Sequence, residues 1–424
     1  MSGSKNSDTK RRLILIELNE LNFDLVGEYT AFRKLPALEK LLSGAQLRTS
    51  SENEYEKLEP WIQWVSVHTG LDARQHGIFR LGDIVGNPAP QFFEKIESAG
   101  FSVGCISPMN AENRLKNPAY FIPDPWTVTT TDGSWWSRAL GGAISQAVND
   151  NAQSRISIKS AILILLGLMR FASPKHYSLY LKLIFRSRRA AWRKALVLDL
   201  LLHDLHMNWF RSKRPDFSTL FLNAGAHIQH HYLFNAKPIK SRNELRNPDW
   251  YLAADCDPFG EMLEVYDCIL SDYLKQQDAE VIVSTGLSQK PYDRVKYYYR
   301  LRDHALFLQS LGLVFRTVHP RMTRDFLIEF SDHESLKRAE EMLASITVEE
   351  TDQRLFGEID NRGDSLFVTL TYPREIVDST RIKWGDESQP LKPLVAFVAI
   401  KNGMHQSDGF SFFTQGVEFT SSGN

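Results

Sequence analysis

The stretch RRLILIELNELN, residues 11–22, carries the strongest fold signal in the chain. Its apolar run is short and rich in branched residues, which is typical of a central parallel strand buried on both faces. Polar residues follow at its end, namely Glu17, Asn19 and Glu20. Their oxygens could bind a hard divalent cation, or they could serve only as turn and cap residues. Because an unpaired buried carboxylate is costly, Glu17 favours the first interpretation.

Helix and strand patterns alternate after this strand. LPALEKLLSGA (35–45) has helical spacing and a glycine stop, and EPWIQWVSVHTG (59–70) places Pro60 at a first helical position. FSVGCISP (101–108) is again typical of a strand. This rhythm predicts an α/β fold with an open, mostly parallel sheet and helices on both faces.

Changes of character along the chain predict three parts. Residues 127–214 hold a long helical pattern and are expected to form a helical insertion. A strand–helix–strand set predicts a small α+β lobe over 318–374. The α/β core is then expected to comprise residues 1–126, 215–317 and 375–424, which agrees with two or three structural units for 424 residues.

The composition narrows the class of protein. Hydrophobic residues make up 43% and charged residues 24%, and the net charge of −1 gives no sign of a nucleic-acid partner. Three scattered cysteines without a CxxC motif indicate reduced thiols, so we expect a cytoplasmic protein. The longest apolar run, AILILLGLM at 161–169, is shorter than the roughly 20 residues that a membrane span needs.

A basic cluster lies within the expected insertion. It consists of Arg186, Arg188, Arg189, Arg193 and Lys194. Such a run is compatible with a solvated helix face, or with contact to anionic lipid or a phosphorylated substrate. The second interpretation predicts a protein that is peripheral at the inner membrane surface.

Histidines gather in NAGAHIQHHYLF, residues 223–234. His227 and His231 are spaced i, i+4 and share one helical face, whereas His230 is expected to point elsewhere. This helix follows the strand TLFLNAG, and ligands bind at the carboxyl ends of strands in open α/β sheets. The pair could bind a metal or could make ordinary hydrogen bonds. His405, in GMHQSDG, would be a third ligand and would leave one metal position open.

Two carboxylates outside this region have different expected roles. Glu59 precedes a helix N-terminus, where free N–H groups attract anions. Asp332 lies in FSDHES, ahead of a well-formed helical pattern, and is predicted to be a helix cap.

In this order the motifs resemble the alkaline phosphatase superfamily, in particular its type I phosphodiesterase/nucleotide pyrophosphatase branch. The matching stretches are LILIELNEL, VSVHTG with RQHGIF, FLNAGAHIQHH, VIVSTGLSQ and GMHQSDG. The resemblance implies an alkaline phosphatase-like fold and a metal site on His227, His231 and His405. The residues of a second metal site fall on Asn19, Thr285 and Gly286, and the hydroxyl nucleophile falls on Pro60 or Leu58.

The resemblance therefore implies a metal-dependent hydrolase or transferase with one histidine-rich site. Zinc is the expected metal, with manganese as the alternative, and Glu17 and Asn19 are further candidate ligands. Glu59 and Glu20 are the candidate catalytic residues. Thr285, Gln289 and Arg300 are expected to contact a small or lipid-linked phosphate-type substrate.

Another reading stays open because neither Pro60 nor Leu58 has a hydroxyl group. In that reading the protein keeps the fold and binds an anion, or a glycan- or lipid-linked phosphate, without hydrolysing it. The sequence predicts neither the substrate nor the oligomeric state.

Overall fold

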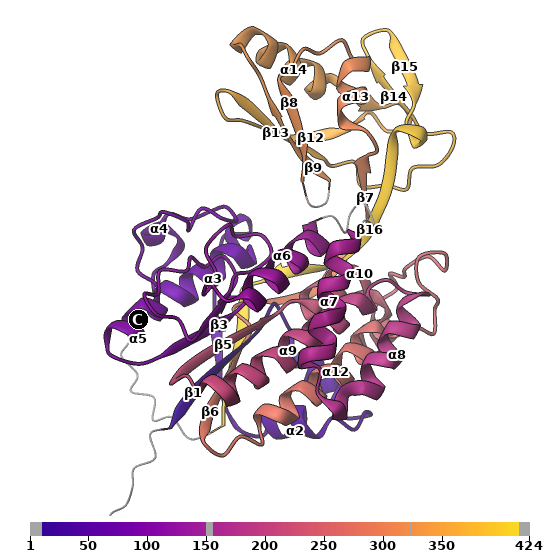
Figure 1. Ribbon diagram of the computed structural model, residues 1–424. Coiled ribbons are helices and arrows are strands. Elements are labelled where there is room, and N and C mark those ends of the chain that lie inside the picture. Colours follow the sequence, from indigo (N-terminus) through magenta and orange to yellow (C-terminus); the bar gives the residue numbers. More distant parts are fainter. Residues whose placement is uncertain (1–10, 150–155, 322–323, 415–424) are drawn as a thin grey trace, which may run out of the picture.

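The computed structural model describes residues 11–149, 156–321 and 324–414 (Figure 1). The first and last ten residues of the expected core therefore lie outside the described residues. A larger α/β domain carries a smaller lobe on a two-stranded arm (Figure 1).

The larger domain is built on a seven-stranded sheet in the order β2-β17-β6-β1-β5-β3-β4. Its strands are β1 (Arg12–Leu18), β2 (Ala45–Ser50), β3 (Val103–Ile106), β4 (Tyr120–Ile122), β5 (Phe217–Leu222), β6 (Ala279–Ser284) and β17 (Asp408–Phe413). From β6 to β4 all neighbours are parallel, and β17 joins β6 and β2 in antiparallel register. The predicted mostly parallel α/β sheet is confirmed.

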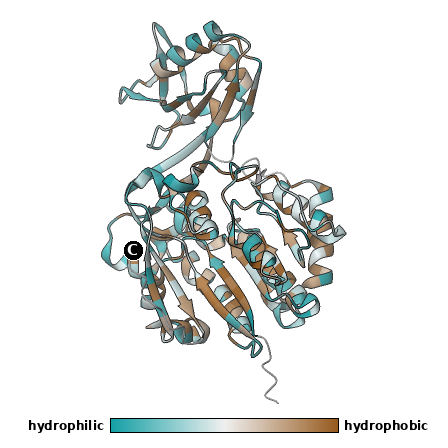
Figure 2. Cartoon of the chain, turned by 90° about the vertical axis from the view of Figure 1, so that its left-hand side faces the viewer, coloured by the Kyte–Doolittle hydropathy of each residue, from teal (hydrophilic) through white to brown (hydrophobic). Residues whose placement is uncertain are grey.

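The opening stretch forms β1, the central strand of this sheet. Ile14, Ile16 and Leu18 point to one face and join the main hydrophobic core. Leu15 points to the other face and packs with Phe93 and other residues of a second cluster. Because side chains alternate along a strand, a continuous apolar run is needed to cover both faces. The central strands are accordingly hydrophobic along their length (Figure 2).

Helices cover both faces of the sheet. Those around the core of the larger domain are α1 (Phe23–Thr30), α2 (Pro36–Leu42), α3 (Pro60–Thr69), α4 (Ala73–His76), α5 (Phe92–Ser98), α10 (Ala224–Tyr232), α11 (Lys237–Arg242) and α12 (Pro258–Tyr273). Pro60 begins α3 as predicted, and Gly70 ends it in the left-handed conformation with φ of 72°.

The expected insertion contains four helices, which are α6 (Trp135–Asn149), α7 (Ile158–Phe171), α8 (Tyr177–Ser187) and α9 (Arg193–Lys213). Helix α9 packs against β5 and α12, so it belongs to the main hydrophobic core. Helices α7 and α8 both pack on α9 and lie at the surface of the larger domain (Figure 1).

The arm consists of β7 (Ser288–Leu301) and β16 (Val395–Gln406), paired in antiparallel register. The lobe that it carries has its own core, drawn from residues between Tyr299 and Val395, a longer stretch than the expected 318–374. Its elements are α13 (His304–Ser310), β8 (Thr317–Pro320), β9 (Asp325–Glu329), α14 (His333–Ser345), β10 (Thr347–Val348), β11 (Gln353–Arg354), β12 (Phe356–Asn361), β13 (Ser365–Leu370), β14 (Arg381–Trp384) and β15 (Glu387–Pro390). Asp332 caps α14 as predicted, because its Oδ1 accepts a hydrogen bond of 2.8 Å from the Ser335 amide.

Candidate metal centre

Glu20 follows β1 and has a left-handed backbone, with φ of 58°. This conformation is unfavourable for a residue with a Cβ atom and persists only where surrounding contacts fix it. Two contacts do so here: the Glu20 amide donates to the Thr285 carbonyl at 3.3 Å, and the Gln229 side chain donates to the Glu20 carbonyl at 2.9 Å. The Glu20 carboxylate is thereby held in a buried position at the carboxyl ends of the central strands.

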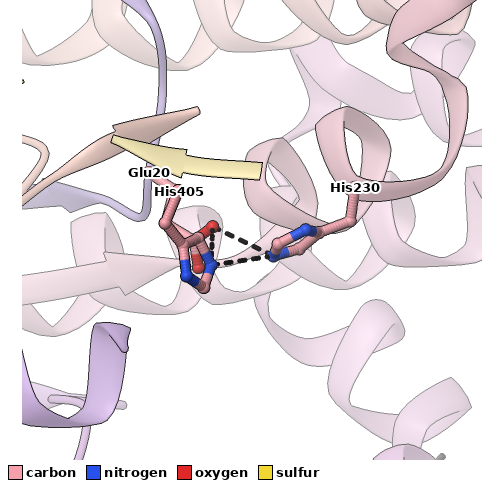
Figure 3. Close-up of side chains that lie close together, drawn as sticks. All are labelled: Glu20, His230 and His405. Carbon is pink, nitrogen blue, oxygen red and sulfur yellow. Dashed lines mark hydrogen bonds and ion pairs between the residues drawn. The ribbon is translucent and has the colours of Figure 1, made fainter. Parts of the chain in front are cut away.

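Two histidines meet this carboxylate from distant parts of the chain (Figure 3). His230 lies on α10 and His405 on β16, and their Nε2 atoms are 3.0 Å and 3.1 Å from the same oxygen, Oε2 of Glu20. The two Nε2 atoms are 3.3 Å apart. Three ligand-type atoms therefore converge on one point (Figure 3).

These separations fit a small divalent cation. Zinc has bonds to nitrogen and oxygen of about 2.0–2.1 Å, which places tetrahedral ligand atoms roughly 3.3 Å apart. A set of two imidazoles and one carboxylate is suited to zinc, and also to other first-row divalent metals. The His230 side chain is 22% exposed, so the cluster can be reached from outside.

The charges of Glu20, His230 and His405 shift one another's pKa values. Burial raises the pKa of Glu20, but the neighbouring His405 and His230 outweigh it and leave this pKa well below its usual range. Burial lowers the pKa of His405, and the charge of Glu20 reverses this effect, so that its pKa is raised. For His230, burial prevails over Glu20 and the pKa is lowered. The carboxylate thus stays ionised, as a metal ligand must be.

Neighbouring amides orient the Glu20 carboxylate. Gln289 Nε2 donates to Glu20 Oε2 at 2.5 Å, and Asn19 Nδ2 donates to Glu20 Oε1 at 3.2 Å. The Asn19 carbonyl oxygen is used in turn by Trp64, which donates to it at 2.7 Å. The structure therefore places Asn19 and Gln289 as supports of Glu20, with the Asn19 oxygen already occupied.

Glu59 lies beside this cluster, immediately before Pro60 at the start of α3. It makes no capping hydrogen bond, although it occupies the N-cap position. Its Oε2 is 3.8 Å from His405 Nδ1, and its side chain is 33% exposed. Burial raises the pKa of Glu59, and His405 and Lys401 reduce that effect only in part. The Glu59 carboxylate is therefore accessible at the N-terminus of α3 and is not used to cap the helix. It lies between Leu58 and Pro60, the two positions on which the resemblance places a nucleophile.

Cations on the arm face the same region. Lys401 on β16 is close enough to affect the pKa of His405, Glu59 and His230. In the register of the arm it lies directly opposite Lys296 on β7. Burial and the neighbouring cations lower the pKa of Lys296 to about 8. Like charges placed opposite each other destabilise a strand pair, and neither lysine has an ion pair among the described residues.

Arg324 extends this cationic region from the lobe. Its guanidinium carbon lies 4.3 Å from the centroid of the Tyr298 ring, and Lys296 Nζ lies 5.7 Å from the same ring. The arm and the adjoining edge of the lobe therefore bring three cations together, Lys296, Arg324 and Lys401, of which Lys401 is near the candidate centre.

The predicted pair His227 and His231 does not join His405. Their rings pack against each other with centroids 4.9 Å apart, and burial holds the pKa of His231 well below its usual range. Among the described residues, only His230 of this helix belongs to a group of metal-ligand atoms. The expectation that His230 points elsewhere is corrected: the packing of α10 against β16 turns this side chain towards Glu20.

Glu17 lies apart from the cluster, on the opposite side of β1. It is buried and its Oε1 is 2.9 Å from Nε2 of His68. Strand alternation accounts for this position, because Glu17 shares the face of Leu15. The predicted buried carboxylate thus has a histidine partner from α3.

The three residues expected to contact the substrate do not lie together. Thr285 is buried and its Oγ1 accepts a hydrogen bond from the Phe410 amide at 2.9 Å, which joins β6 to β17. Arg300 lies opposite Ala396, towards the lobe end of the arm and eleven positions from Gln289. Of the three, Gln289 contacts the Glu20 carboxylate with its side chain, and Thr285 contacts Glu20 only through its backbone carbonyl.

Sequence reasoning set aside His230 and did not single out Lys401. The spacing of His227 and His231 identified a helical face but not the direction in which that face points. The sequence did contain a signal for Lys401. It lies four residues before His405 in the same strand pattern, and an even spacing in a strand puts two side chains on one face.

Comparisons with known proteins give weak similarities over most of the chain. No protein-family model matches this sequence, and neither does any curated protein. Among solved structures, a phosphonoacetate hydrolase from Sinorhizobium meliloti 1021 in complex with phosphonoformate is 14% identical, with a TM-score of 0.39, covering 97% of this chain and 92% of that chain. The human ectonucleotide pyrophosphatase/phosphodiesterase 5 is 11% identical, with a TM-score of 0.37, covering 95% of this chain and 87% of that chain.

Proposed function

We propose that this protein is a metal-dependent hydrolase or transferase acting on a phosphate-type ester, with one cation held by Glu20, His230 and His405. The observation that carries the proposal is the convergence of these three side chains at the carboxyl ends of the central strands. Parallel α/β sheets bind ligands at this edge. Zinc is the first choice of metal and manganese the second.

Lewis acidity is what a divalent cation contributes at such a centre, where it polarises a phosphoryl oxygen and favours ionisation of water. Three protein ligands leave a position open for substrate or water. Gln289 and Asn19 fix the orientation of the Glu20 carboxylate, and such supporting hydrogen bonds raise the affinity of a metal site.

Glu59 is assigned the role of general base. A water molecule attacks phosphorus, its proton passes to the Glu59 carboxylate, and the bond from phosphorus to the leaving-group oxygen breaks. This route needs no hydroxyl nucleophile, in agreement with Pro60 and Leu58 at the matching positions. Glu59 makes no capping hydrogen bond, and its Oε2 lies 3.8 Å from His405 Nδ1, so this carboxylate is free to act beside the cluster. In a transferase, an acceptor hydroxyl takes the place of the water.

The cations of the arm favour a substrate that carries negative charge. Lys401 and Lys296 face each other without a carboxylate partner among the described residues, and a bound phosphate-type group would offset their repulsion. Small and lipid-linked phosphate esters share this group, so the arm selects charge and does not distinguish the two.

A second candidate function is anion binding without turnover. The observation in its favour is the absence of a hydroxyl side chain at Pro60 and Leu58, the two positions on which the resemblance places the nucleophile. In this reading the cations hold the ligand, and Glu59 moves no proton.

Metal analysis of purified protein tests the proposal. We expect about one metal ion per chain in the wild type, a loss in His230→Ala and His405→Ala, and retention in the matched control His227→Ala. Loss of metal in His227→Ala with retention of metal in His230→Ala would show that the site lies on the other face of α10. Absence of metal from all four proteins would contradict the proposal.

An activity screen with phosphomonoesters, phosphodiesters and sulfate esters separates the two functions. Hydrolysis that requires metal and falls in Glu59→Gln supports the enzyme. Saturable binding of the esters without turnover, in metal-loaded protein, supports the binding protein.

A further inference from the structure

Helices α7 and α8 expose large apolar side chains in regular stripes. On α7 the exposed residues are Ile158, Ile162, Leu165, Leu166 and Met169, and on α8 they are Tyr177, Leu181, Ile184 and Phe185. Both sets follow i, i+4, i+7, i+8 spacing, which defines one face of a helix. Ile158 is 81% exposed, Met169 74%, Leu181 69% and Phe185 68%. Side chains of this size are rarely exposed together unless another surface covers them.

The two stripes point away from the core. Each helix uses its other face to pack on α9, through Phe171 of α7 and through Tyr180 and Leu183 of α8. The helices are joined by a short connection that includes a 3₁₀ turn, Pro174–His176. Together they form an outer layer of the larger domain (Figure 1). Large apolar side chains are exposed on both helices.

The residues of this layer carry charge of one sign, and three of its cations, Lys175, Lys182 and Arg193, pair with carboxylates of α12. From residue 156 to residue 198 the sequence contains no Asp or Glu, and its nine basic residues are Lys159, Arg170, Lys175, Lys182, Arg186, Arg188, Arg189, Arg193 and Lys194. Arg186, Arg188 and Arg189 are exposed and form no ion pair among the described residues. Arg188 lies over the ring of the exposed Phe185, with 5.9 Å from its guanidinium carbon to the ring centroid. Apolar and cationic groups are therefore adjacent on the same helix.

We infer that the outer face of α7 and α8 docks on an anionic phospholipid membrane surface. Apolar stripes flanked by lysine and arginine are the composition of helices that lie in the plane of a membrane interface. Anionic headgroups attract the basic residues, and the apolar side chains enter the boundary with the acyl chains. None of the described helices is long and apolar enough to cross a bilayer.

A second copy of the chain is a poorer occupant of this face. A two-fold dimer brings the same surface of both subunits together, so cations would oppose cations. An anionic membrane covers the apolar stripes and neutralises the charge at once. The inference is independent of the metal centre, because none of its residues belongs to that site. A location at the inner membrane surface stays a prediction.

Vesicle co-sedimentation of the full chain at low salt tests the inference. The vesicles contain phosphatidylcholine alone, or phosphatidylcholine mixed with phosphatidylglycerol. We expect binding to the mixed vesicles and about tenfold weaker binding, or less, to the neutral ones. Replacing Leu165, Met169, Leu181 and Phe185 together by Gln should weaken binding to mixed vesicles at least about tenfold.

Two further variants complete the design. Leu306→Gln/Val314→Gln removes exposed apolar side chains from the lobe, which are 64% and 70% exposed, and should bind vesicles like the wild type. Arg186→Glu/Arg188→Glu/Arg189→Glu should weaken binding to mixed vesicles by about a hundredfold. Circular dichroism confirms that each variant keeps its fold, as expected for exposed positions.

Three results would overturn the inference: no binding of wild type to mixed vesicles, unchanged binding of the four-site variant, or equal binding to both vesicle types. Light scattering measures the oligomeric state and so tests whether a second copy of the chain covers this face. A wild-type dimer that the four-site variant dissociates, without vesicle binding, would identify a second copy as the occupant.

Discussion

Two clusters of histidine and carboxylate side chains in this protein differ in how they share charge. In the first, Glu20 serves both His230 and His405 with a single oxygen. In the second, between α9, α12 and the start of α8, two histidines have two aspartates: His176 is 2.7 Å from Asp204 and His203 is 2.9 Å from Asp272. Both clusters bring ligand-type atoms within 4.8 Å of one another.

The second cluster is closed by additional partners. Asp204 accepts hydrogen bonds from the Tyr180 hydroxyl and the Ser173 amide, each at 2.9 Å. Asp272 is in contact with Lys175. Each carboxylate is therefore satisfied within the protein, and the network joins the insertion to α12.

The difference teaches that histidine and carboxylate content alone does not indicate a metal site. In the closed cluster each carboxylate has several partners within the protein, which favours a role in packing. In the Glu20 cluster, two histidines and Gln289 all contact one oxygen, Oε2 of Glu20. Glu59 and Lys401 lie close to this cluster. The proposed function places a cation in the first cluster and assigns none to the second.

The largest expected effect comes from removing the shared carboxylate. Glu20→Gln should abolish metal retention and reduce kcat by about 10³-fold or more, because several kcal/mol of transition-state stabilisation are lost with the cation. Metal content and ester hydrolysis measure this effect. Thermal unfolding of metal-free protein is the control, and a large loss of stability there would make Glu20 a structural residue like Asp204.

The reciprocal change in the closed cluster should act on stability instead. Asp204→Ala removes one partner of a buried pair and should lower the free energy of unfolding by about 3 kcal/mol. Urea denaturation measures this value. Metal content should remain that of the wild type, and a parallel loss of metal would show that the closed cluster also binds a cation.

A smaller effect is expected from the cation nearest the candidate centre. Lys401→Met keeps the length of the side chain and removes its charge, and should raise KM about tenfold, since hydrogen bonds to charged groups contribute about 1.5–3 kcal/mol. Lys392→Met, at an exposed ion pair with Asp378, is the control and should leave KM unchanged. Steady-state kinetics of the best ester measures both, and a fall in kcat with unchanged KM would contradict a binding role for Lys401.

The smallest expected effect concerns pH. Burial lowers the pKa of His176, but Asp204 and Cys268 reverse this effect and raise the pKa to about 9. A raised pKa stabilises the fold fully below the unfolded value of about 6.5, and this contribution is lost as pH rises through about 9. We expect the free energy of unfolding to fall by on the order of 1 kcal/mol for each pH unit between these two values. Urea titrations at several pH values measure the decline, which should be absent from His176→Gln; a decline of equal size in that variant would point to other groups.

Much of the fold follows from patterns that need no tertiary information. The apolar run at 12–18 is typical of a strand covered on both faces, and Pro60 and Gly70 delimit α3 as expected. For these elements the local sequence pattern and the structure agree. The functional role of the carboxylates at the end of β1 stays a prediction.

The choice among the histidines could not be predicted in the same way. Helical spacing relates His227 to His231, but the rotation of α10 about its axis depends on how Ile228 and its neighbours pack between β16, α9 and α12. Those contacts come from segments far apart in the sequence. A rotation of one residue, about 100°, decides whether His230 or His231 faces Glu20.

The two-stranded arm has a mechanical consequence. His405 lies near one end of β16 and the lobe begins at Val395, so ten residues, or roughly 33 Å of strand, separate them. Over this lever, a swing of the lobe by about 3 Å corresponds to a turn of only about 5° at the strand that holds His405. A displacement of the lobe would therefore reach the candidate centre as a small change in the orientation of the strand that holds His405.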